Sequence, residues 1–177
     1  MKVRRIARQL ARTDGAEIAE AALVLPLVFM LLLGIVWFGR AFNIYSTIQQ
    51  AAQQGAIAAA RSSCVTCGNA LPSDTTVTGV VEGVMKASSI DTSQILVSPN
   101  PAAPVFCPNP PNRCDTYNDN VKVCRNVLLN PPAGGTQPPQ CGAVVSFQYP
   151  FQFYLPFTSL NMQKIILSAQ AQTRMEN

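Results

Sequence analysis

The chain has 177 residues, of which 12% are charged and none is histidine, and its formal net charge at pH 7 is +4. The absence of imidazole excludes Ser-His-Asp and Cys-His catalytic groups and His-ligated zinc, and with them most hydrolase mechanisms. This length holds at most one modest domain with an appendage. The low charge content and the six cysteines indicate a membrane and an oxidising compartment rather than a cytosolic globule.

Residues 1–15 form a basic leader. Five of the 13 Lys and Arg residues of the chain lie in it, at Lys2, Arg4, Arg5, Arg8 and Arg12. A basic segment next to a membrane span has lipid as its natural partner, and no Gly-rich phosphate loop accompanies it. We therefore expect a lipid bilayer as a partner, and we expect no nucleic acid, no small-molecule substrate and no cofactor.

Residues 21–39 contain no charged side chain and are predominantly apolar. At 1.5 Å per residue a helix over this range measures roughly 28 Å, close to the hydrocarbon thickness of a bilayer. Trp37, Phe38 and Arg40 end the run as interfacial anchors do. Five basic residues precede the span and few follow it. The positive-inside rule therefore predicts a single-pass protein with a cytoplasmic N-terminus.

The helix is expected to continue beyond the membrane, running from near Ile18 to near Ser62 within a segment 16–62. Small and apolar residues recur at three- and four-residue intervals, and polar residues lie largely opposite them. Small residues permit close approach by another chain, but we favour packing on the protein's own globular domain. The apolar stripe comprises Ile44, Ile48, Ala51, Ala52, Gly55 and Ala59, and the polar side comprises Asn43, Thr47, Gln50, Gln53, Gln54 and Arg61.

Residues 63–177 predict a small extracytoplasmic head. Ser73 or Asp74 can cap a short helix that ends near Ser88. Apolar runs at 94–98, 121–128, 143–153 and 164–174 predict antiparallel strands, and Pro-rich segments between them predict loops. The expected fold class is α+β: a long N-terminal transmembrane helix that extends into a small disulfide-stapled head with antiparallel strands.

All six cysteines lie in the head. An even number of cysteines on the oxidising side of a membrane predicts three structural disulfides, with 15 possible connectivities. The C-x-x-C spacing of Cys64 and Cys67 also matches thiol-disulfide exchange motifs, so a membrane-anchored redox protein is an alternative. This motif closes a helix instead of opening one, and a zinc site would need a second C-x-x-C. The cysteines are Cys64, Cys67, Cys107, Cys114, Cys124 and Cys141.

Two acidic residues, Glu17 and Glu20, lie between the leader and the span. Glu20 directly precedes the apolar run, and a carboxylate drawn into the bilayer costs about 2.5–3.5 kcal/mol unless a cation meets it. Both acids can instead reach water or Arg12 in the headgroup region. If the chain is cut after Gly15, the new amine of Ala16 lies one helical turn from Glu20, or reaches Glu20 of a neighbouring subunit.

A short basic leader ending in Gly, a carboxylate at the fifth position after it and a hydrophobic helix together resemble the class III signal sequence of type IV pilin-like proteins. More narrowly, Glu20 with AALVLPLVFMLLLGIVWFGRAF and the following Gln/Ala-rich helix into AAR resembles the TadE family of pseudopilins from bacterial tight-adherence (Flp) pilus systems. The segments YPF at 149–151 and KIILSAQAQTRME at the C-terminal end also fit. Ala21 replaces the aromatic residue common in the family, and Glu17 is an additional acid.

The resemblance implies a non-enzymatic pilin-like protein that takes part in assembling an adhesive pilus or related secretion machinery. It implies that Gly15 and Ala16 flank the bond cut by a prepilin peptidase, that Glu20 is the processing and assembly carboxylate, and that Pro26 is the proline of the membrane helix. The implied partners are that peptidase, an inner-membrane assembly platform and other pilin-like subunits. The implied location is the bacterial inner membrane, with the cell surface or the pilus as further destinations.

A third interpretation is a bitopic anchor whose head binds a polysaccharide or a host surface. The aromatic-rich segment 147–157 would supply its adhesive face. A β-sheet core and a rim that grazes the membrane explain the same aromatic residues equally well.

Overall fold

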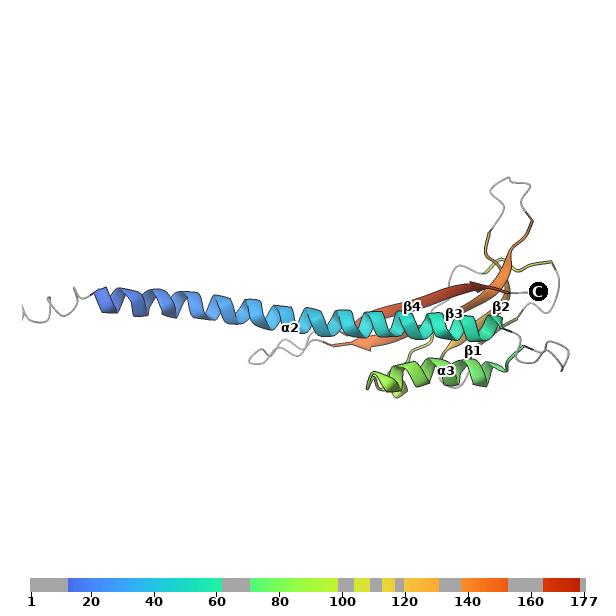
Figure 1. Ribbon diagram of the computed structural model, residues 1–177, viewed down its shortest axis with the longest axis horizontal. Coiled ribbons are helices and arrows are strands. Elements are labelled where there is room, and N and C mark those ends of the chain that lie inside the picture. The colour runs from blue at the N-terminus through green and yellow to red at the C-terminus, as the bar shows by residue number, and fades with distance from the viewer. Residues whose placement is uncertain are drawn as a thin grey trace, which may run out of the picture. The chain divides into compact units, whose positions relative to one another are not determined.

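The computed structural model describes residues 13–61, 71–98, 104–108, 113–116, 120–130, 138–152 and 164–175. The chain divides into two compact units, Met1–Ala41 and Phe42–Asn177. We call the second unit the head. The long helix α2, Thr13–Ala60, contributes its first half to the first unit and its second half to the head (Figure 1).

Helix α2 confirms the predicted long helix, although it begins earlier than the expected start near Ile18. Pro26 lies inside α2 without ending it. In the head, helix α3 (Asp74–Ala87) confirms the predicted cap, because the Ser73 hydroxyl accepts a hydrogen bond from the Thr76 backbone N–H at 3.3 Å. The buried face of α3 consists of Val77, Thr78, Val81 and Met85.

The sheet is a meander of four antiparallel strands in the order β1-β2-β3-β4. Its strands are β1 (Arg113–Thr116), β2 (Lys122–Leu128), β3 (Cys141–Phe151) and β4 (Ile165–Arg174). The runs predicted at 121–128, 143–153 and 164–174 are thus confirmed as strands, with small shifts of their ends. Strand β1 falls in a segment that we predicted to be a loop.

The strand predicted at 94–98 is wrong. Thr92–Gln94 form a short 3-10 helix, η1, capped by Asp91. In the rest of this run Leu96 forms an isolated bridge, in which its N–H donates to the Gln148 carbonyl at 2.8 Å and its carbonyl accepts from the Gln148 N–H at 2.9 Å. The Asp91 carboxylate favours a turn here by accepting hydrogen bonds from the Ser93 N–H and hydroxyl.

The core of the head lies between α2, α3 and one face of the sheet. The α2 stripe is buried in it, which confirms the prediction that this stripe packs on the protein's own domain. A Cβ on Gly55 would lie 2.6 Å from the Val81 Cγ2 and 3.4 Å from a Val145 Cγ, so glycine permits this close approach of α2 to α3 and β3. The residues that α2 buries are Thr47, Ile48, Ala51, Ala52, Gly55, Ala56, Ala59 and Ala60.

Thr47 was predicted on the polar side of α2 and is buried instead. Its hydroxyl donates to the Asn43 carbonyl at 2.9 Å, a bond within the helix that satisfies the polar group away from water. On the opposite face of the sheet a smaller apolar cluster forms, because alternate residues of a strand point to opposite faces. It consists of Cys124, Val127 and Val144 with the partly buried Phe106, Cys114 and Leu129.

Candidate membrane and assembly interface

The first half of α2 exposes large apolar side chains on all sides. Leu23, for example, is 78% exposed. In the described part of the chain α2 is the one helix long and apolar enough to cross a membrane, and none of its most apolar window is buried. Water disfavours such a surface, whereas a bilayer core accepts it and a helix satisfies its own backbone there.

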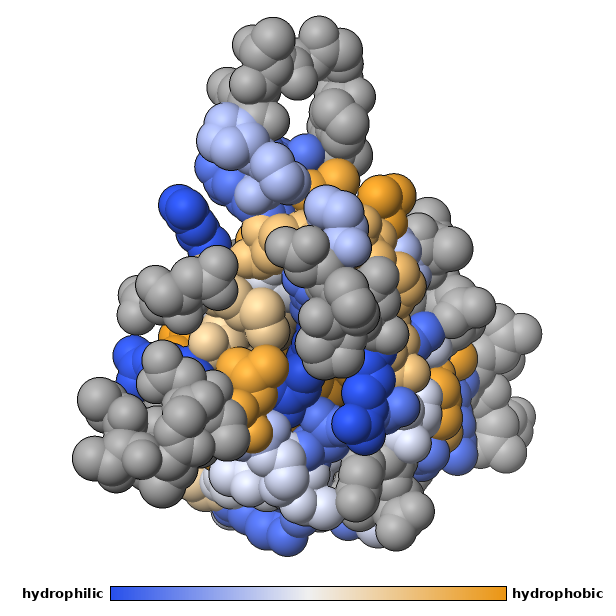
Figure 2. All heavy atoms as spheres, turned by 90° about the vertical axis from the view of Figure 1, so that its right-hand side faces the viewer, coloured by the Kyte–Doolittle hydropathy of each residue, from blue (hydrophilic) through white to orange (hydrophobic). Residues whose placement is uncertain are grey.

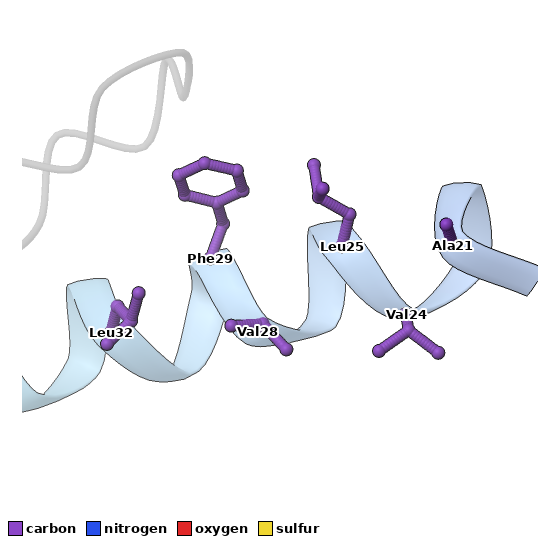
Figure 3. A pocket seen from close by; sticks show the side chains of 6 residues that line it. All are labelled: Ala21, Val24, Leu25, Val28, Phe29 and Leu32. Atoms are coloured by element: carbon purple, nitrogen blue, oxygen red, sulfur yellow. The ribbon is translucent and has the colours of Figure 1, made fainter. Parts of the chain in front are cut away.

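Six side chains near the start of the span line a shallow, open hollow on the surface of α2. In Figure 3 Leu25 and Phe29 point to one side in the view and Val24 to the other, and all six residues share one broad face of the helix because they recur at intervals of three and four. All six are apolar, so the hollow offers no polar group that would orient a small-molecule substrate. It suits lipid chains or another apolar helix. The lining residues are Ala21, Val24, Leu25, Val28, Phe29 and Leu32.

Glu20 lies one turn before Val24 on the same helix and is exposed. Within the described residues neither Glu17 nor Glu20 has an ion-pair partner, since the ion pairs there all involve residues of the head. An unpaired carboxylate beside an apolar span is unfavourable in lipid. A cation that pairs with Glu20 would therefore have to come from outside the described residues.

The predicted processing bond, Gly15–Ala16, lies within α2, close to the first residue that the structure describes. Gly15 is exposed, and nothing lies within 4 Å of the position that a Cβ on it would take. The free space around Gly15 suits a bond that a protease must reach.

Pro26 lies within the apolar part of α2. It has no N–H, so the carbonyl of Ala22, four residues earlier, lacks its usual helical donor. A membrane helix tolerates such a carbonyl where neighbouring groups supply a donor.

The far end of the span carries an aromatic and a basic residue in contact. The Arg40 guanidinium carbon lies 5.7 Å from the centroid of the Trp37 ring. This is a cation–π arrangement, and both residue types favour the membrane–water boundary.

Two disulfides of the head are defined. Cys114 pairs with Cys124 across β1 and β2, and Cys107 pairs with Cys141 at the start of β3. The second bridge spans 34 residues and ties the segment before β1 to the sheet. Cys64 and Cys67 lie outside the described residues, so the predicted third disulfide stays a prediction.

The suggested adhesive aromatic face is wrong for the part of it that the structure describes. Phe147, Tyr149 and Phe151 are buried in the head, because β3 is one of the two interior strands of the sheet and packs in the core with α2. Residues 153–157 lie outside the described ranges. The face of the head in Figure 2 shows small apolar groups interrupted by hydrophilic residues.

A buried ion pair organises the head, and the sequence analysis did not identify it. The Arg125 guanidinium donates to the Asp74 carboxylate at 2.8 Å, to the Ala59 carbonyl at 2.9 Å and to the Pro72 carbonyl. Arg125 therefore connects β2 to the end of α2 and the start of α3. Its neighbour Asn126 has φ of 59° and follows Arg125 in the irregular part of the β2–β3 pairing.

Little else in the described residues resembles a reactive centre. No group of three or more His, Cys, Asp or Glu residues there could hold a metal ion. Asp91 has a lowered pKa, because hydrogen bonds from the Ser93 hydroxyl, the Ser93 N–H and the Gln94 amide favour its charged form. Those bonds belong to the cap of η1, so this shift has a structural cause.

Comparison with known proteins supports the resemblance. The family model described as TadE-like protein matches residues 15–56, which confirms the predicted TadE-like character of this segment. The matched segment begins at Gly15, contains Glu20 and Pro26, and extends into the buried stripe of α2. Neither a curated protein nor a solved structure matches the chain.

Proposed function

We propose that this TadE-like chain is a non-enzymatic pseudopilin that takes part in assembling an adhesive pilus or related secretion machinery. The single observation that carries the proposal is the family match over residues 15–56. A pilus-associated pseudopilin role in general follows from that match. The two surfaces of α2 support it, because one half is suited to lipid or other helices and the other half holds a folded head.

The leader 1–15 is removed in this proposal by a prepilin peptidase that cuts between Gly15 and Ala16. The five basic residues of the leader would otherwise hold the N-terminus at the anionic leaflet with about 1 kcal/mol each. Cutting after Gly15 therefore makes it easier to extract the span from the bilayer. The exposure of Gly15 and the free space around it support access of the peptidase.

Glu20 would then pair with the new amine of Ala16, within one subunit or between neighbours. The described residues offer Glu20 no cation, and burying an unpaired carboxylate among apolar helices is costly. The amine created by processing has the charge and the position to meet it. This pairing links the cut to assembly.

The proposed location is the bacterial inner membrane, with the leader in the cytoplasm and the head outside. The charge distribution around the span supports this orientation. The two disulfides of the head support an oxidising compartment. The further partners would be an inner-membrane assembly platform and other pilin-like subunits.

A thiol-disulfide function would depend on Cys64 and Cys67, because the other four cysteines are joined in the two disulfides. Labelling of the native protein with a thiol reagent separates the two functions. A pseudopilin scaffold predicts no labelling before denaturation. Stoichiometric modification of Cys64 or Cys67 with the other four protected would favour redox chemistry instead.

Mass spectrometry of the membrane-extracted chain tests the proposal. In cells that contain the prepilin peptidase we expect a mature chain that begins at Ala16, and in cells without it the full leader. Gly34→Val is the matched control for Gly15→Val, because a Cβ at either glycine has nothing within 4 Å. The Gly15→Val chain should keep its leader while the Gly34→Val chain loses it. A leader that stays intact in the assembled protein would contradict the proposal.

A further inference from the structure

The head exposes large apolar side chains where α2 enters it. Phe42 is 73% exposed and Ile166 is 53% exposed, and Tyr45 and Ile165 are also exposed. We call these four residues the foot of the head. They contrast with the rest of β4, whose apolar residues Ala169 and Ala171 are buried.

A hydrogen bond fixes the alignment of the two elements that carry the foot. The Gln49 Nε2 of α2 donates to the Ser168 carbonyl of β4 at 3.0 Å. Figure 1 shows β4 running in the same direction as the second half of α2. Moving back from this bond, Tyr45 lies about 6 Å earlier along the helix, and Ile166 lies about 6.6 Å earlier along the strand. The foot residues therefore lie at matching levels.

The two aromatic residues also lie on the correct side of α2. Phe42, Tyr45 and Gln49 are spaced by three and four residues, so they share one face of the helix. Since the Gln49 side chain reaches β4, Phe42 and Tyr45 lie on the side of α2 that carries the start of β4. The foot is thus made by two elements that lie side by side, with Ile165 on the α2 side of β4 and Ile166 on the other face of the sheet.

We propose that the foot lies in the interfacial region of the bilayer, next to the point where the span emerges. This inference rests on the proposed membrane anchoring of α2. Phe42 follows Gly39 by about 4.5 Å of helix, which is within an interfacial region roughly 5–8 Å deep on each side, and Tyr45 follows it by about 9 Å, at the outer edge of that region. The continuity of α2 therefore brings the foot to lipid headgroups.

The shape of the foot favours lipid over a protein partner. Neighbouring strand residues point to opposite faces, so Ile165 and Ile166 expose apolar groups on both faces of the sheet at once. Fluid lipid can contact both faces of the sheet, whereas a docked protein covers one face. The nearby charges are basic: Arg40 and Lys164 flank the foot, and no Asp or Glu occurs in residues 39–61 or 150–175. Anionic headgroups suit this charge.

Depth-dependent quenching of tryptophan fluorescence tests the proposal in the full chain. The chain has one tryptophan, Trp37, so Trp37→Phe gives a background without tryptophan. Into it we would place Ile166→Trp, or Gln172→Trp as the control. Gln172 is exposed on the same face of β4, about 20 Å further along the strand. The probe is vesicles of phosphatidylcholine and phosphatidylglycerol with brominated acyl chains.

We expect Ile166→Trp to lose most of its fluorescence on brominated vesicles and Gln172→Trp to lose little. Equal quenching at both positions would contradict the proposal that the foot in particular lies in the interfacial region. So would a blue shift of Ile166→Trp emission without quenching, which would indicate a protein partner or a second copy. Quenching of Trp37 in the natural chain separates the two proposals. If Trp37 is quenched and Ile166→Trp is not, only the interfacial position of the foot is contradicted. If neither is quenched, membrane anchoring of α2 is contradicted as well.

Discussion

The two halves of α2 place apolar residues in opposite environments. Before Gly39 the residues are large and exposed, such as Leu23 and Phe29. After Phe42 they are mostly small and buried, such as Ala52 and Ala56. One continuous helix therefore presents an exposed apolar surface in its first half and a surface packed in a protein core in its second half.

This difference shows that apolar content alone does not define a membrane span. Both halves are rich in apolar residues, but only the first presents bulky side chains on every side. The second half uses Gly55 and alanines to bring a helix against a sheet. A helix surface suited to lipid has large apolar side chains on all sides, whereas a surface suited to protein packing has small ones along one face.

The largest effect is expected where the second half of α2 is fastened to the head. Arg125→Met takes away the buried partner of the Asp74 carboxylate, which then keeps only its longer contact with the exposed Arg113 at 3.6 Å, and removes the donor to the Ala59 carbonyl. We expect a loss of about 3–5 kcal/mol in the free energy of unfolding of the head. Urea unfolding of the full chain in detergent, followed by near-UV circular dichroism, measures it.

The double variant Arg125→Met with Asp74→Asn is the control, because it removes both charges. It should lose less stability than Arg125→Met alone. If Arg125→Met unfolds at the same urea concentration as the natural chain, the ion pair does not organise the head.

A charge placed on the first half should act on insertion instead of folding. Leu31→Arg puts a cation near the middle of the span and should disfavour membrane insertion by about 3 kcal/mol. Gln53→Arg, on the exposed side of the second half, should leave insertion unchanged. Carbonate extraction of membranes measures the inserted fraction. Equal membrane retention of the two variants would remove the distinction between the halves.

Glycines give a smaller and more local comparison within the same helix. Gly55→Ala should destabilise the head by roughly 1–3 kcal/mol, because the new Cβ would contact the Val81 side chain in a packed core. Gly34→Ala meets nothing within 4 Å and should leave the stability of the head unchanged. Thermal unfolding of the two variants compares them, and a Gly55→Ala variant as stable as Gly34→Ala would show that α2 packs less closely than described.

The smallest effect is expected at Asp91, far from either surface of α2. Its lowered pKa means that its charged form stabilises the folded head above the unfolded pKa, and that this contribution disappears as pH falls through the folded pKa. Asp91→Asn should therefore differ from the natural chain at pH 7, and the difference should begin to shrink below about pH 4 and vanish once the pH is below the lowered folded pKa. Unfolding curves at several pH values check this. A difference that stays constant with pH would show that the Asp91 side chain stabilises the head through something other than its charge.

Local sequence patterns predicted most of the fold, but they did not predict contacts between residues far apart in the sequence. The Ser73 cap and the apolar runs of β2, β3 and β4 depend on neighbours in sequence, so they could be predicted. Strand β1 could not, because Arg113–Thr116 directly follows a Pro-rich segment, has no apolar alternation and is joined to β2 by the Cys114–Cys124 disulfide.

The candidate residues divide in the same way. Glu20 was identified because it directly precedes an apolar run, and Pro26 because of the resemblance of that run to a known family. The partner of Arg125, Asp74, lies 51 residues away in sequence, and no local pattern connects them. The foot was missed for the same reason, because α2 and β4 come together only in the folded head.

The most direct test of the pseudopilin function compares two acids of the same turn. Glu17→Gln and Glu20→Gln each remove one negative charge beside the span and keep the size of the side chain. The measurement is co-purification of pilin-like subunits with each full-length variant from cells that express the whole pilus system. We expect both variants to reach the membrane and only Glu20→Gln to lose the co-purifying subunits. A Glu20→Gln chain that co-purifies them as well as the natural chain does would show that the Glu20 charge has no part in assembly.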